Sequence, residues 1–122
     1  MEHSQNQSIG YVVGRIVDSH QPYYSKELIG LIPNDILQMG LANGNPREAS
    51  VKIDDLRVRK EKDLLKWLGI QTSGPKLSEA EIQELVDSVR AREERGEFPP
   101  EQQQRVREIN FLFNVATIVA RQ

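Results

Sequence analysis

Residues 109–122 read INFLFNVATIVARQ, a stretch in which the few polar side chains recur every three or four positions. On a helix of 3.6 residues per turn, these polar side chains share one narrow stripe, and apolar side chains cover the rest of the circumference. Burying each large apolar side chain is worth about 1.5–3 kcal/mol before the entropic cost of ordering it. Such a helix must therefore be buried on most sides, either in the core of this protein or against a partner. The polar stripe consists of Asn110, Asn114, Thr117 and Arg121.

The composition of the whole chain is typical of a single folded domain. Its 122 residues are 38% hydrophobic and 28% charged. The formal net charge of -2 gives no overall attraction to nucleic acid or to anionic lipid. Cysteine is absent, which excludes disulfides, thiolate catalysis and cysteine-based zinc sites.

Neither end of the chain predicts a targeting or membrane segment. Residues 1–8 are polar and lack the apolar core of a secretory signal. The longest apolar run is interrupted by Asn114 and Thr117, and it is much shorter than the ~20 residues that span a bilayer. We therefore expect a cytoplasmic protein that makes no contact with membranes.

The first half of the chain has the sequence pattern of β-structure. Residues 9–17 are apolar and rich in β-branched side chains, and residues 28–32 form a second short apolar run. A proline near the start and a glycine at the end predict a short helix over residues 33–39. The alternation in residues 51–58 fits either a bulged strand or a strand followed by a helix start. Together these signals predict a small antiparallel sheet over residues 8–58.

The second half of the chain has the pattern of helices. A short helix is expected at residues 60–70, with Gly69 as its C-terminal stop, followed by a linker at residues 71–76 that contains Gly and Pro. Ser78 and Glu81 have the spacing of a capping box, which fixes the start of the next helix. Residues 78–121 then predict two helices joined by a short connection, which makes them antiparallel neighbours.

These patterns predict an α+β fold. The chain, residues 1–122, is expected to be one domain in which a small antiparallel N-terminal sheet packs with a C-terminal antiparallel helical hairpin. The first helix of that hairpin has one narrow apolar stripe, whereas the last is apolar round most of its surface. The two cannot cover each other fully, so the last helix must also contact the sheet or another chain.

No arrangement of residues in the sequence predicts catalysis or metal binding. Asp18, Ser19 and His20 are consecutive, so on an extended segment their side chains alternate in direction and cannot form a triad. His3 and His20 lack the spacing of metal ligands, and no glycine-rich phosphate loop is present. We therefore predict no catalytic residue, cofactor or metal and no enzymatic activity, with a dispersed carboxylate site as a remaining alternative.

The apolar last helix instead favours protein binding. We expect a non-enzymatic adaptor or small subunit that docks to a protein partner or complex through this helix, and a homodimer is compatible with the same pattern. A tryptophan in the short helix, off its apolar stripe, either packs at the core or helix edge, which we favour, or serves as an aromatic anchor for a partner. The predicted interface residues are Trp67, Phe111, Phe113, Val115, Ile118 and Val119.

A second hypothesis comes from residues 31–41, LIPNDILQMGL, followed by Gly44. This segment resembles the strand, Ile-Pro, short helix and Gly-Leu of AbrB/MazE-type swapped-hairpin DNA-binding proteins. The resemblance implies an intertwined dimer, a DNA-binding regulator or antitoxin, whose basic residues contact phosphates. Such binding would weaken steeply with salt. The local basic patch assigned to this role is Arg57, Arg59, Lys60 and Lys62.

Overall fold

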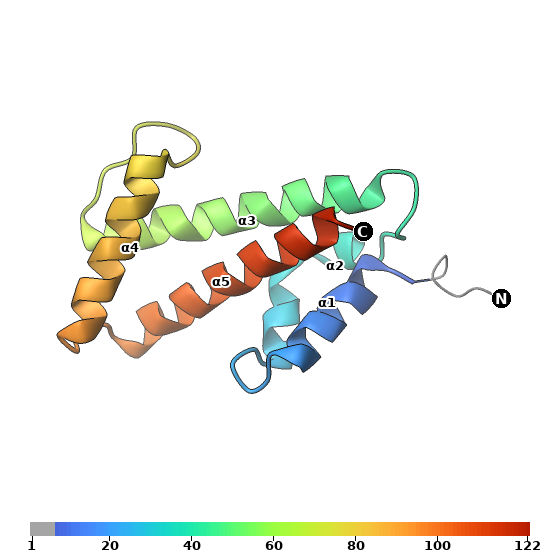
Figure 1. The fold of residues 1–122 in the computed structure, drawn as a ribbon, viewed down its shortest axis with the longest axis horizontal. Coiled ribbons are helices and arrows are strands. Elements are labelled where there is room, and N and C mark those ends of the chain that lie inside the picture. Colours follow the sequence, from blue (N-terminus) through green and yellow to red (C-terminus); the bar gives the residue numbers. More distant parts are fainter. Residues whose placement is uncertain (1–6) are drawn as a thin grey trace.

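The computed structural model describes residues 7–122, and every regular element in that part of the chain is a helix (Figure 1). The predicted α+β fold is wrong, because residues 7–122 contain no sheet and only an isolated antiparallel bridge between Ser8 and Gly40. The fold is all-α. Its elements are α1 (Ile9–Ser19), the 3-10 helix η2 (Lys26–Leu31), α2 (Asn34–Leu37), α3 (Asn45–Leu68), α4 (Glu79–Glu94) and α5 (Pro100–Ala120).

The first predicted strand, residues 9–17, is part of the helix α1. Its start is fixed by Ser8, whose hydroxyl oxygen accepts a hydrogen bond from the backbone N–H of Tyr11 at 3.3 Å. The apolar residues of α1 are three or four positions apart, so they form one continuous buried face. Burial of that face outweighs the preference of β-branched side chains for strands. The buried residues are Ile9, Val12, Val13, Ile16 and Val17.

The long helix α3 replaces both the strand predicted within residues 51–58 and the separate helix predicted over residues 60–70. In the sequence, Asp54 and Asp55 interrupt the apolar alternation of residues 51–58, but in α3 they lie outside the buried face. The predicted stop at Gly69 is confirmed, because its φ of 81° lies in the left-handed region that glycine adopts without strain.

The remaining predicted elements are confirmed in part. Residues 28–32, predicted as a strand, lie mostly in η2, whereas the short helix predicted over residues 33–39 is present as α2. The hydroxyl oxygen of Ser78 accepts from the N–H of Glu81 at 3.1 Å, and the Glu81 carboxylate accepts from the N–H of Ser78 at 2.8 Å. The capping box at the start of α4 is therefore confirmed.

The two C-terminal helices do not form a hairpin on a sheet. Instead, α5 lies antiparallel along α3, and α4 crosses one end of the α3–α5 pair (Figure 1). The hydroxyl of Ser50 in α3 donates to the carbonyl oxygen of Ala116 in α5 at 2.7 Å, which ties the other end of the pair. The last helix therefore finds most of its cover in α3 and the N-terminal helices.

Buried apolar side chains form two clusters, one at each end of the α3–α5 pair. The larger cluster joins α1, η2 and α2 to α3 and α5, and it includes Phe111, whose ring meets that of Tyr24 edge-on with centroids 5.2 Å apart. The smaller cluster joins the end of α3 to α4 and to the start of α5. Its buried members are Leu64, Leu65, Leu68, Leu85 and Phe98.

Tyr24 also connects the N-terminal helices to the polar stripe of α5. Its hydroxyl donates to Oδ1 of Asn110 and accepts from Nδ2 of Asn114. Tyr24→Phe should therefore lower the free energy of unfolding by about 1 kcal/mol, since hydrogen bonds are lost while the ring remains. Urea denaturation measures the change, with Tyr23→Phe as a control because Tyr23 is 48% exposed. Equal effects of the two substitutions would contradict the role of the Tyr24 hydroxyl.

Candidate functional site

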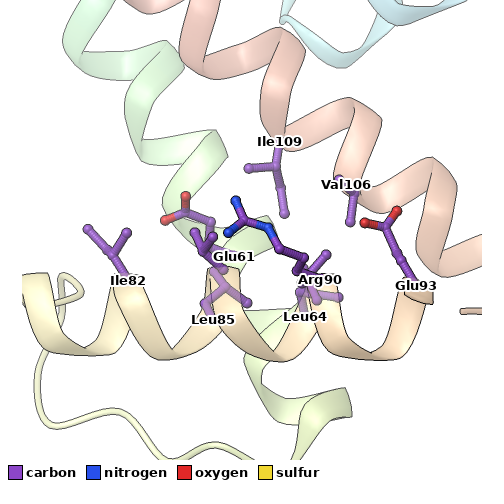
Figure 2. Close-up of a pocket in the computed structure, with 10 residues that line it drawn as sticks. Glu61, Leu64, Ile82, Leu85, Arg90, Glu93, Val106 and Ile109 are labelled. Atoms are coloured by element: carbon purple, nitrogen blue, oxygen red, sulfur yellow. The ribbon is translucent and has the colours of Figure 1, made fainter. Parts of the chain in front are cut away.

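An apolar groove of about 240 Å³ lies between α4 and the α3–α5 pair (Figure 2). Along α4, Leu85 is buried, whereas Ile82 and Val86 remain 39% and 38% exposed. The apolar stripe of α4 is thus wider than the surface that α3 and α5 cover, and the rest of it faces the groove. The opposite side is formed by Glu61, Leu64, Val106 and Ile109.

Glu61 is the buried charged residue of this groove and is only 8% exposed. Its Oε2 atom pairs with Nη1 of Arg57, whereas its Oε1 atom is buried without a hydrogen-bond partner among residues 7–122. In the view of Figure 2 the carboxylate lies between the side chains of Ile82 and Arg90. An unpaired buried acceptor is unfavourable, so a hydrogen-bond donor placed here would be stabilising.

Burial raises the pKa of Glu61, while the positive charge of Arg57 acts in the opposite direction. The folded protein therefore loses stability as the pH rises from the ordinary glutamate value of 4.5 through the raised pKa. Glu61→Gln removes this loss. The free energy of unfolding of the variant, relative to that of the wild type, should therefore increase as the pH rises from 4.5 through the raised pKa of Glu61. Urea denaturation from about pH 4 to 8 tests this. A difference that stays constant with pH would contradict the raised pKa.

Phe113 extends the apolar surface of the groove by one turn of α5 beyond Ile109. Its side chain is 53% exposed, and the guanidinium of Arg57 lies over its ring at 5.7 Å from the centroid. Arg57 also donates from Nε to Oδ1 of Asp54 at 2.6 Å. One arginine thus connects the exposed Phe113 ring to the buried Glu61 carboxylate.

The α5 residues predicted as an interface have different environments. Phe111, Val115 and Val119 are fully buried in the larger cluster, and so are covered by this protein itself. Ile118 is half-buried and lines a separate cleft beside α1. Phe113 alone among these five is strongly exposed. The exposed part of the predicted surface therefore adjoins the groove.

Trp67, the predicted aromatic anchor, lies at the end of α3 and is half-buried. Its ring meets Phe98 edge-on with centroids 5.2 Å apart, and the guanidinium of Arg92 lies over it at 5.0 Å. The indole thus packs within the smaller cluster and does not line the groove.

The predicted phosphate-binding residues lie on α3, and three of the four contact other protein groups. Arg57 pairs with Asp54 and Glu61, and the Lys60 ammonium lies 3.1 Å from Glu108. Lys62 donates to the carbonyl oxygen of Gly74 at 2.9 Å, whereas Arg59 is exposed.

The swapped-hairpin resemblance does not describe the fold. Residues 31–41 span the end of η2, the short helix α2 and the following turn, and the described chain has no strands that could swap. The swapped-hairpin dimer that the resemblance implies is therefore wrong for the described residues.

The adjacent Asp18, Ser19 and His20 do not form a triad. The Ser19 hydroxyl donates to the carbonyl oxygen of Arg15 at 2.9 Å. Nδ1 of His20 lies 2.8 Å from the carbonyl oxygen of Ile16. Within residues 7–122, no three His, Asp or Glu side chains are placed to hold a metal ion, and His3 lies outside this part. None of the helices in these residues combines the length and apolarity needed to cross a bilayer.

Sequence reasoning missed Glu61, Ile82 and Val86 as site residues. The signal for Glu61 is its position within a buried helical face, three residues after Val58 and four before Leu65. It becomes visible only when α3 is recognised as one helix. The exposure of Ile82 and Val86 depends on the angle at which α4 crosses the pair, which the local sequence does not specify.

The fold and the groove define an all-helical protein with a partly open apolar surface beside a buried carboxylate. Comparisons of the chain with protein-family models, curated proteins and solved structures found no match.

Proposed function

We propose that this protein is a non-enzymatic adaptor or small subunit that binds a helical segment of a partner protein in the groove between α4 and the α3–α5 pair. The observation that supports the proposal is the incompletely covered apolar stripe of α4. Ile82 and Val86 remain exposed at the groove, and Phe113 is exposed on α5 one turn beyond the groove residue Ile109. Exposed apolar patches bordered by charged residues are typical of interaction sites.

A helix suits this groove because all its sides are helices. Three apolar stripes converge there, from α3, α4 and α5, and an amphipathic helix would add a fourth and complete a small bundle. Full burial of a large apolar side chain gives about 1.5–3 kcal/mol, so completing the burial of three half-covered side chains gives roughly 3 kcal/mol. Micromolar binding requires about 8 kcal/mol, so further contacts are needed.

Affinity capture from the native host tests this proposal with the wild type and two variants. Val86→Asp places a charge in the groove, whereas Val51→Asp makes the same change at a 55% exposed valine outside it. We expect a stoichiometric protein to survive nuclease treatment with the wild type and Val51→Asp, and to be lost with Val86→Asp. Capture of the same proteins by both variants, or of nuclease-sensitive material alone, would rule the proposal out.

A further inference from the structure

The charge of α4 restricts what can occupy the groove. Over Glu79–Glu94 this helix carries six acidic and two basic side chains. A second copy of this chain, placed symmetrically on the groove, would bring two acidic α4 helices together, which is unfavourable. An acidic partner or a nucleic acid would meet the same repulsion. A basic partner would be attracted.

Glu61 supplies a second and independent observation inside the groove. Glu61 is only 8% exposed, and its Oε1 atom lacks a hydrogen-bond partner among the described residues. From α3, Arg57 already binds the other oxygen and is shared with Asp54. From α4, Arg90 and Glu93 line the groove but make no ion pair with Glu61.

The α5 side of the groove also provides no hydrogen-bond donor for Oε1 of Glu61. It contributes the apolar Val106 and Ile109, neither of which can donate a side-chain hydrogen bond. Among residues 7–122 no group donates to Oε1 in this structure, so a donor from a partner would find this acceptor unoccupied. Lysine and arginine donate N–H groups to carboxylates in short, charge-assisted hydrogen bonds.

We infer that the occupant of the groove is a basic amphipathic helix that places one lysine or arginine side chain against Oε1 of Glu61. This inference rests on the proposed function and names the chemistry of its partner. The apolar face of the incoming helix covers Val86 and Ile82, its basic side chain pairs with Glu61, and its other basic residues face the acidic α4. Glu61 thereby determines specificity, because a helix without this donor leaves the carboxylate oxygen buried and unpaired.

The probe for this inference is a displayed library of 16-residue peptides with leucines fixed along one helical face and all other positions random. Peptides selected on the wild-type protein should be enriched in lysine and arginine over aspartate and glutamate. Their Kd should rise about tenfold on Glu61→Gln, a change of ~1.4 kcal/mol. Glu84→Gln removes the same charge from an exposed position on α4 outside the groove and should change the Kd less than twofold.

The outcomes separate this inference from the proposed function. Peptides that lose binding on Val86→Asp, yet are not enriched in basic residues or respond equally to Glu61→Gln and Glu84→Gln, would overturn the assignment of a basic helix and leave the docking groove intact. Failure to select any peptide whose binding depends on Val86 would overturn both. Replacing the proposed pairing residue of a selected peptide by norleucine should abolish its sensitivity to Glu61→Gln.

Discussion

Phe111→Ala should destabilise the protein by about 3–5 kcal/mol, a large part of the stability of a domain of this size. The side chain is 0% exposed and contacts Tyr24 edge-on in the larger cluster. Its removal leaves a cavity between α5 and the N-terminal helices, which rigid helical neighbours cannot fill completely. Chemical denaturation followed by circular dichroism at 222 nm, where helices give a strong negative band, measures the change in the free energy of unfolding.

Phe113→Ala is the matched control, because it makes the same substitution two residues later in the same helix. Phe113 is 53% exposed, so its truncation should lower stability by less than ~1 kcal/mol. Comparable losses for the two variants would contradict the orientation of α5 and, with it, the exposure of the groove surface.

Arg57→Leu should destabilise the protein by roughly 3 kcal/mol at neutral pH, because it leaves the Glu61 carboxylate buried without a counter-charge. The two side chains are only 15% and 10% exposed, so little water reaches the pair. The loss should shrink as the pH falls, since protonation removes the uncompensated charge of Glu61. Urea denaturation at several pH values measures both effects.

The double variant Arg57→Leu/Glu61→Leu provides the control for this pair. Replacing both charges by apolar side chains removes the buried carboxylate, so much of the stability lost in Arg57→Leu should return. A double variant as unstable as the single one would show that Arg57 acts through other contacts, such as those with Asp54 or the Phe113 ring.

The helix ends of the C-terminal half were predicted well because their signals are local. The Ser78 capping box and the glycine after α3 fix helix ends through short-range hydrogen bonds and backbone geometry. The burial of α5 also followed from its composition. The elements that cover α5 could not be predicted from composition, because an apolar surface is compatible with any apolar cover. Only the tertiary structure places Phe111, Val115 and Val119 against the N-terminal helices.

The N-terminal half was mispredicted because β-propensity was weighted above periodicity. The β-branched residues of α1 suggested a strand, although their spacing is helical, from Ile9 to Val12 and Val13 and then to Ile16 and Val17. Tertiary packing decided the outcome. The same error divided α3 and hid the buried position of Glu61, so the groove could not be found from the sequence.

Docking in the groove can be tested by an NMR titration of the isotopically labelled protein. The ligand is a selected peptide whose binding is lost on Val86→Asp. Occupation of the groove predicts the largest chemical-shift changes at Ile82, Val86, Ile109 and Phe113, with small changes in α1 and η2. Shifts concentrated at the cleft beside α1, or spread evenly over the molecule, would contradict docking in the groove.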